Sequence, residues 1–240
     1  MIQAIKQRMV EECPVRPGDQ VLDVGCGLGH ELQRLAAQVG PEGHVVGIDV
    51  NTAMVAEARR RAIALDLPIV IEVGDAHALG FEDYRFDLCR VERVLRYLER
   101  PETAVREMTR VARRGGIVLA FDFDSDQTVV DAPDRALTTR IAQVLDDAVP
   151  NPWIGRRLFG LLRRIGLADV RVVPHAICLT GSRGLAMYRQ LNEATITGAQ
   201  RAEKITADEV DAWWRAVEEA GRTESFFLAN VGFIATGRKR

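Results

Sequence analysis

Apolar residues along the first half of the chain follow two alternating patterns, which indicate strands followed by helices. In some stretches the apolar side chains recur at three- and four-residue spacing, as expected for helices with one face in a core. Between these stretches lie short apolar runs typical of buried strands, at residues 20–24, 44–48, 69–73, 86–89 and 117–123. Strands that alternate with helices predict a parallel sheet with right-handed crossovers.

After residue 124 the order changes, because several helical patterns follow one another with few strands between them. Helices are predicted at 131–149, 153–165, 181–195 and 206–220, and strands at 169–173 and 226–235. Trp213 and Trp214 are neighbours on one predicted helix, so we expect only one of them to face the core.

The fold class predicted from these patterns is α/β: a Rossmann-like, doubly wound sheet of about seven strands, with helices on both faces and a small helical cap. We expect one domain over residues 1–240, because no linker separates the later helices from the rest. Residues 125–150 and 181–221 are expected to be helical insertions on the substrate side of that domain.

The turn after the first predicted strand carries glycines at every second position: Gly25, Gly27 and Gly29. Glycine lacks a Cβ and adopts positive φ, so such a turn lets the backbone approach a ligand closely. In a doubly wound sheet the ligand lies outside the carboxyl ends of the strands. Asp23 stands where the strand pattern predicts an apolar residue. We therefore predict that a nucleotide-like cofactor binds at this turn.

Two kinds of cofactor, a nicotinamide dinucleotide and S-adenosylmethionine, are candidates for this turn. The dinucleotide fingerprint is GxGxxG with an acid about 20 residues further on. Here the turn spells GxGxG, and His30 occupies the third glycine position, although Asp49 lies 20 residues after Gly29. A carboxylate at Asp23 repels a pyrophosphate and suits a cationic ligand. A ligand with an ammonium, a sulfonium and a ribose fits both acids, which favours S-adenosylmethionine over a nicotinamide dinucleotide.

Five motifs then follow one another in order: Val21-Leu22-Asp23-Val24-Gly25-Cys26-Gly27-Leu28-Gly29, Gly47-Ile48-Asp49, Gly74-Asp75-Ala76, Phe86-Asp87-Leu88-Cys89 and Gly115-Gly116. Together they make residues 20–124 resemble a class I S-adenosylmethionine-dependent methyltransferase. The resemblance implies that Asp49 binds the ribose hydroxyls, that Asp75 and Ala76 lie at the adenine, and that the glycine turn lies under the methionine moiety. The cofactor-binding residues it implies are Asp23, Gly25, Cys26, Gly27, Gly29, Asp49, Val50, Met54, Gly74, Asp75, Ala76 and Arg90.

Within this family the chain is most similar to the small-molecule branch that includes the ubiquinone/menaquinone-type methyltransferases. Many members of that branch carry a histidine pair after the fourth strand, where this chain has Arg96-Tyr97. A quinone-precursor acceptor therefore does not follow from the resemblance. The loop before the fifth strand has Arg114-Gly115-Gly116 where proline-glycine-glycine is usual.

Arg90, Arg93 and Arg96 recur at every third residue, which on a helix places them on one face. They either form ion pairs with nearby acids, or Arg93 or Arg90 binds an anionic group of the acceptor. No residue stands out as a catalytic base. Orientation alone can lower the barrier of an in-line methyl transfer by roughly 7–11 kcal/mol, so catalysis does not require one. The substrate-side candidates are Arg93, Asp124, Trp153, Arg156 and Tyr188.

The net charge narrows the range of partners. There are 32 Lys and Arg against 34 Asp and Glu, a net charge of −2, which disfavours a nucleic-acid-binding protein. The four cysteines and four histidines show no metal-ligand spacing, and no apolar run is long enough to span a membrane. We expect a reduced, metal-free, cytoplasmic protein.

The expected function is methyl transfer from S-adenosylmethionine to a small organic acceptor, by O- or C-methylation. Among small organic acceptors, the resemblance alone favours aromatic or polyketide-like molecules. One alternative is a methyltransferase-like protein that binds the cofactor without transferring the methyl group, as a cyclase, a decarboxylase or a binding protein. A protein methyltransferase is a further alternative. The acceptor and the oligomeric state, including a homodimer, stay open.

Overall fold

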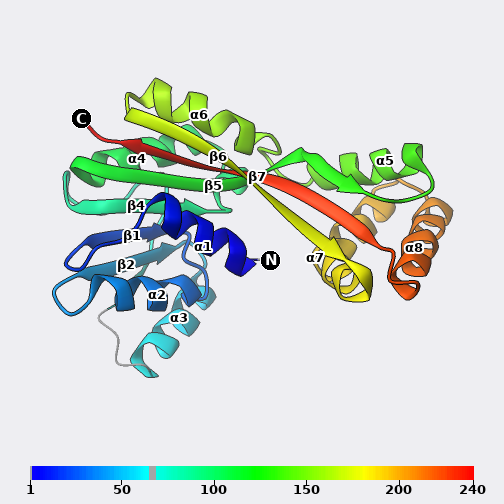
Figure 1. The fold of residues 1–240 in the computed structure, drawn as a ribbon, viewed down its shortest axis with the longest axis horizontal. Coiled ribbons are helices and arrows are strands. Elements are labelled where there is room, and N and C mark those ends of the chain that lie inside the picture. The colour runs from blue at the N-terminus through cyan, green and yellow to red at the C-terminus, as the bar shows by residue number, and fades with distance from the viewer. Residues whose placement is uncertain (1, 65–68) are drawn as a thin grey trace.

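The strand order confirms the predicted doubly wound sheet (Figure 1). The computed structural model describes residues 2–64 and 69–240, and in these ranges seven strands form one sheet in the order β3-β2-β1-β4-β5-β7-β6. Strands β1 to β5 are parallel to one another, and β7 runs antiparallel between β5 and β6. The strands are β1 (Gln20–Val24), β2 (His44–Asp49), β3 (Ile69–Val73), β4 (Phe86–Glu92), β5 (Ala112–Val130), β6 (Ala168–Thr180) and β7 (Phe227–Arg238).

Helices cover both faces of the parallel part of the sheet, because successive side chains of each strand point to opposite faces. Val21 joins a core cluster with the helices α1, α2 and α3, whereas its neighbour Leu22 joins a second cluster with α4 and α6. These helices are α1 (Ile2–Glu12), α2 (His30–Val39), α3 (Thr52–Ala64), α4 (Pro101–Val111) and α6 (Ile154–Ile165). In the described ranges, no helix combines the length and the apolar character that a membrane span requires.

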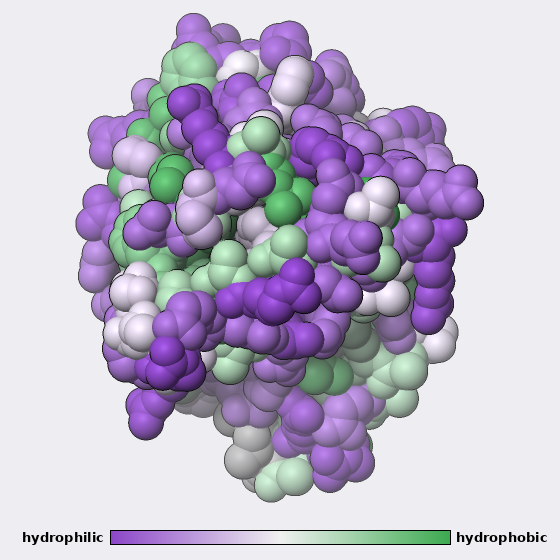
Figure 2. All heavy atoms as spheres, turned by 90° about the vertical axis from the view of Figure 1, so that its right-hand side faces the viewer, coloured by the Kyte–Doolittle hydropathy of each residue, from purple (hydrophilic) through white to green (hydrophobic). Residues whose placement is uncertain are grey.

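The ends of β5, β6 and β7 run beyond the parallel strands and carry a separate helical lobe, on the right in Figure 1. The lobe consists of α5 (Arg135–Asp146), α7 (Gly181–Arg201) and α8 (Ala207–Arg222). Its own core contains Tyr188, Trp213, Trp214 and Phe226, which lie apart from the two sheet clusters. Figure 2 views the molecule from the end of this lobe, where polar residues cover most of the surface and apolar side chains gather near its centre.

The long antiparallel strands differ from the sequence expectation. Strand β5 was expected to end at Phe123 and continues to Val130, past a register shift against β7 between Phe123 and Thr128. Strand β6, expected at 169–173, extends over 168–180 because β7 pairs with it along its whole length. These extensions depend on pairing with a distant strand, which a local apolar pattern does not reveal.

The expectation for the two adjacent tryptophans is also wrong. Trp213 and Trp214 are both buried, at 1% and 7% exposure. Helix α8 packs against both α7 and α5, so two of its faces are covered. The ring of Tyr188 lies 5.8 Å from that of Trp213 and 6.2 Å from that of Trp214. The Trp213 indole N–H donates to the hydroxyl of Thr138 at 3.2 Å.

Candidate active site

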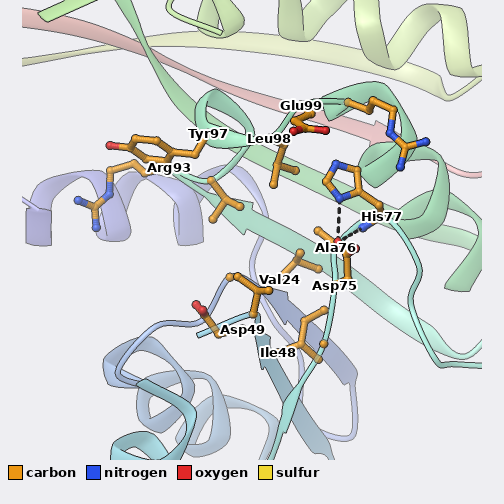
Figure 3. Close-up of a pocket in the computed structure, with 15 residues that line it drawn as sticks. Val24, Ile48, Asp49, Asp75, Ala76, His77, Arg93, Tyr97, Leu98 and Glu99 are labelled. Atoms are coloured by element: carbon orange, nitrogen blue, oxygen red, sulfur yellow. Dashed lines mark hydrogen bonds and ion pairs between the residues drawn. The ribbon is translucent and has the colours of Figure 1, made fainter. Parts of the chain in front are cut away.

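A cavity of about 430 Å³ opens where β1 meets β2 and β4, at the carboxyl ends of these strands (Figure 3). This is the point at which the strand order reverses, and it is where doubly wound folds bind their ligands. The walls come from the end of β1, the end of β2, the turn after β3 and the segment after β4. The volume is that of a small-molecule site.

The glycine turn folds back onto the end of β2. Gly25, Gly27 and Gly29 all have positive φ, at 75°, 54° and 73°. The backbone N–H groups of Gly25 and Cys26 both donate to the carbonyl of Ile48, at 2.8 and 2.9 Å. Gly25 itself lines the cavity. At Gly25 the turn therefore places backbone without a side chain in the cavity wall.

Gly25→Ala is expected to be more destabilising than a glycine substitution that only strains the backbone. A Cβ on Gly25 would overlap the side chain of Val94, whereas one on Gly18, which also has positive φ, would meet nothing within 4 Å. Overpacking costs about 1–3 kcal/mol, so the free energy of unfolding should fall by about that much more in Gly25→Ala than in Gly18→Ala. Urea unfolding of both variants measures the difference. Equal losses would show that contact with Val94 does not restrict this position.

Asp49 ends β2 with its carboxylate at the cavity (Figure 3). One carboxylate oxygen accepts the N–H of Gly27 and the other accepts the N–H of Asn51, both at 2.9 Å. Each oxygen keeps a second lone pair, so the group can still accept hydrogen bonds from a ligand hydroxyl. Asp49 thus fixes the glycine turn and also offers acceptors to the cavity.

Asp75 and His77 form a tight turn after β3. One oxygen of Asp75 accepts both the backbone N–H of His77, at 2.8 Å, and its ring Nδ1, at 2.7 Å. The backbone N–H of His77, followed by the ring bond, holds the pKa of Asp75 below its usual range. The second carboxylate oxygen has no partner in the described residues, and Asp75, Ala76 and His77 all line the cavity.

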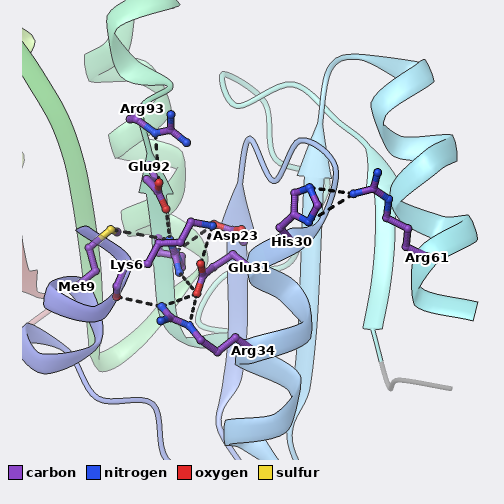
Figure 4. Close-up of polar contacts among 10 residues, drawn as sticks. Lys6, Met9, Asp23, His30, Glu31, Arg34, Arg61, Glu92 and Arg93 are labelled. Atoms are coloured by element: carbon purple, nitrogen blue, oxygen red, sulfur yellow. Dashed lines mark hydrogen bonds and ion pairs between the residues drawn. The ribbon is translucent and has the colours of Figure 1, made fainter. Parts of the chain in front are cut away.

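A buried charge cluster lies beneath α1 and α2 (Figure 4). Arg90, 2% exposed, stands opposite Asp23 in the β1–β4 pairing, with its Nε 3.2 Å from a carboxylate oxygen of Asp23. Its other nitrogens lie 2.9 Å from Glu92 and 3.6 Å from Glu31, and Lys6 pairs with Glu31 at 2.7 Å. Burial raises the pKa of Asp23 to about 6, against the opposing charge of Arg90.

The expected arginine helix after β4 is wrong. Strand β4 continues to Glu92, so Arg90 is a strand residue. Arg93 then adopts a positive φ of 57°, and Arg96 lies in a single 3-10 turn, Leu95–Tyr97. The three side chains therefore share no helix face. Arg93 pairs with Glu92 at 3.2 Å and also lines the cavity.

The structure brings half of the predicted cofactor residues into the lining of the cavity. Those that line it are Gly25, Asp49, Val50, Gly74, Asp75 and Ala76. Those outside the lining are Asp23, Cys26, Gly27, Gly29, Met54 and Arg90. The lining residues that we did not predict are Val24, Ile48, His77, Val94, Tyr97, Leu98, Glu99 and Arg100. Five of these follow β4. Because β4 pairs directly with β1, the segment after β4 lies beside the glycine turn, and this neighbourhood is what could have identified them.

Among the substrate-side candidates, Arg93 alone lines the cavity. Arg156 forms an ion pair with the fully buried Asp124 and lies over the ring of Trp153, 5.4 Å from its centre. These three residues form a cluster of their own, in which the start of α6 meets β5. Tyr188 is buried in the core of the helical lobe.

Comparison with known proteins agrees with this arrangement. Residues 16–153 match the family described as "Methyltransferase domain". An uncharacterized 37.1 kDa protein in transposon TN4556 of Streptomyces fradiae is 40% identical over 171 residues, which are 70% of this chain and 49% of that protein. The ubiquinone/menaquinone biosynthesis C-methyltransferase of Cupriavidus taiwanensis is 32% identical over 155 residues, 65% of this chain and 60% of that enzyme. The matched region is thus about half to three fifths of the length of these relatives.

Solved structures share the fold. The YcgJ protein of Bacillus subtilis superposes with a TM-score of 0.70 at 18% identity, over 99% of both chains. The phosphoethanolamine N-methyltransferase 2 of Haemonchus contortus, solved in complex with S-adenosyl-L-methionine, superposes with a TM-score of 0.63 at 16% identity, over 99% of this chain and 53% of that one. At these identities the likeness concerns the fold. Because the family match covers more than half of the chain, and the motifs and the strand order agree with it, the chain belongs to the methyltransferase domain family, in the class I S-adenosylmethionine-dependent group.

Proposed function

We propose that this chain transfers a methyl group from S-adenosylmethionine to a small organic acceptor. The proposal is based on one observation. The glycine turn, the Asp49 carboxylate and the Asp75–Ala76 turn all contribute to the lining of the same cavity. These come from the ends of β1, β2 and β3, which lie side by side in the sheet. Their order across the sheet suits a ligand with an amino-acid part, a ribose and a base.

The residues present fit that ligand. Asp49 keeps free lone pairs for two ribose hydroxyls, although each of its oxygens already accepts a backbone N–H. Asp75 keeps one free carboxylate oxygen that can accept the adenine amine, and the buried Ala76 offers a small apolar contact. When bound, the cofactor supplies a methyl group on a positively charged sulfur. The chain's own residues bind and orient the two reactants.

The acceptor side of the cavity combines charge with apolar surface. Val94 and Leu98 supply aliphatic contacts, and Tyr97, 60% exposed, adds an aromatic ring. The Arg93 guanidinium can donate paired hydrogen bonds to an anionic oxygen of the acceptor, which would hold a nucleophilic atom in line with the methyl group. A small acceptor also agrees with the net charge of −2, which offers nucleic acid little attraction.

The role of the helical lobe as a substrate-side cap stays a prediction. The predicted insertions at 125–150 and 181–221 contain α5, α7 and most of α8, and no residue from these helices is part of the cavity lining among the described residues. A cap function therefore requires the lobe to contact a bound acceptor that extends beyond the cavity.

Incubation of the protein with methyl-labelled S-adenosylmethionine and panels of aromatic, polyketide-like and anionic acceptors tests the proposal. We expect label in at least one acceptor, with one S-adenosylhomocysteine formed for each methyl group transferred. Saturable cofactor binding without label transfer to any acceptor would contradict methyl transfer, and would favour a cyclase, a decarboxylase or a binding protein.

A further inference from the structure

A second cavity, of about 370 Å³, lies between the start of α4 and the exposed side of α6. We call it the basic groove, because Arg100, Arg106, Arg157 and Arg164 line it, and Glu102 is the one acidic residue of its lining in the described part of the chain. It is distinct from the cofactor cavity, and the two share Arg100.

Helix α6 builds one wall of the basic groove from a regular pattern. Ile154, Arg157, Leu161 and Arg164 recur at three- and four-residue spacing, so they share one helix face. Ile154 and Leu161 are buried, at 2% and 3% exposure, and form the floor, while both arginines are exposed. A packed apolar floor holds the backbone of both arginines in place.

The charges in the basic groove do not balance. Arg106 pairs with Glu102 at 2.6 Å. In residues 2–64 and 69–240, Arg100, Arg157 and Arg164 have no acidic side chain within ion-pair distance. The groove therefore holds three arginines without an ion-pair partner in these residues, on a chain whose net charge is −2, and the charge of Arg100 also acts on Asp75 in the cofactor cavity.

Arginines that lie next to the basic groove, but outside its lining, do have acidic partners. Arg156, next to Arg157 on α6, is neutralised by Asp124, and Arg110 on α4 is neutralised by Glu107 and Asp83. The start of α4 adds to the surplus, because no side chain caps it and the positive end of the helix dipole points into the same region.

We propose that the basic groove binds a phosphate group of the methyl acceptor, an inference that rests on the proposed function. Guanidinium groups donate paired hydrogen bonds to phosphate oxygens, and three of them match a doubly charged phosphate better than a single carboxylate. Because Arg100 lines both cavities, an acceptor held by its phosphate in the groove can extend its other end toward the cofactor cavity.

The double variant Arg157→Gln/Arg164→Gln tests the groove, with Arg163→Gln as the matched control. Arg163 is exposed on the same helix and lies outside the lining. In calorimetric titrations with inorganic pyrophosphate at low salt, we expect saturable binding to the wild type and to Arg163→Gln, and at least tenfold weaker binding to the double variant. Succinate should bind the wild type at least tenfold more weakly than pyrophosphate. Absent pyrophosphate binding, or equal binding by all three proteins, would overturn the proposal.

A titration of the same samples with S-adenosylhomocysteine separates the two proposals. Equal binding by all three proteins is expected, and shows that the double variant is folded. If the wild type does not bind S-adenosylhomocysteine, the proposed function fails regardless of the groove.

The link to the acceptor is tested with paired acceptors that differ only by a phosphate monoester. We expect methyl transfer to the phosphorylated member to have at least a tenfold higher kcat/KM, and expect this preference to vanish in the double variant. No preference in the wild type would show that the groove does not serve the acceptor.

Discussion

Asp49→Ala is expected to weaken S-adenosylhomocysteine binding by about 10- to 100-fold. A hydrogen bond to a charged group contributes about 1.5–3 kcal/mol, and 1.4 kcal/mol corresponds to a factor of ten in affinity. In this chain the substitution has a second effect, because the same carboxylate accepts the N–H groups of Gly27 and Asn51. Its loss therefore releases the glycine turn as well as the ribose.

Isothermal titration calorimetry measures this effect, with two comparison variants. Asp49→Asn keeps one carbonyl oxygen as an acceptor but removes the charge, so we expect a smaller loss of affinity than in Asp49→Ala. Asp169→Ala removes a carboxylate whose side chain is 75% exposed and lies far along the sheet on β6, and should leave binding unchanged. Wild-type affinity in Asp49→Ala would show that the end of β2 does not hold the ribose.

Arg90→Met is expected to lower the free energy of unfolding by about 3–5 kcal/mol at pH 8, the usual result of removing one partner from a buried ion pair. Arg90 lies among Asp23, Glu31 and Glu92, all of them buried or nearly so. Without the guanidinium, Glu31 keeps Lys6 and Arg34, and Glu92 keeps Arg93. Asp23 then has little compensation for its burial.

The loss should depend on pH with a definite sign. Burial already raises the pKa of Asp23 to about 6 in the folded protein, against an unfolded value of about 3.9, and removal of Arg90 raises it further. A carboxyl group with a raised folded pKa supports stability below its unfolded pKa, and this support is lost as the pH rises through the folded pKa. Arg90→Met should therefore be least destabilised near pH 4–5 and most destabilised near pH 8.

Urea unfolding of Arg90→Met at pH 5 and pH 8 checks both statements. Arg60→Met is the control, since Arg60 is 70% exposed and, among the residues that the structure describes, pairs only with Glu57 on its own helix. Exposed pairs of this kind contribute little, so that variant should unfold at nearly the same urea concentration as the wild type at both pH values. Equal losses at pH 5 and pH 8 in Arg90→Met would contradict the assigned charge cluster.

Local sequence patterns were enough to predict the parallel half of the fold. Strands β1 to β4 and the glycine turn are short, continuous segments, and the motifs that hold the glycine turn, Asp49 and Asp75 fall at or directly after the ends of β1, β2 and β3. Parallel strands align their carboxyl ends, so Asp49, Asp75 and the turn had to meet at one edge. The position of these three features in one cavity follows from that geometry.

Features that depend on distant pairing could not be predicted in the same way. Arg90 was assigned to a helix because it recurs with Arg93 and Arg96 at every third residue, yet β4 extends over it and buries it opposite Asp23. Tyr188 was expected near the acceptor, and instead packs in a lobe that forms only where β5, β6 and β7 run past the sheet. The basic groove likewise needs α4 and α6 side by side, although 42 residues separate the end of α4 at Val111 from the start of α6 at Ile154.

A crystal structure of the wild-type protein with S-adenosylhomocysteine tests the central claim most directly, because it shows which side chains surround each part of the ligand. We predict both ribose hydroxyls within hydrogen-bond distance of the Asp49 carboxylate, the adenine beside Asp75 and Ala76, and the sulfur facing Arg93 and Tyr97. Ligand density outside the cavity between β1, β2 and β4, or a ribose that does not touch Asp49, would contradict the account.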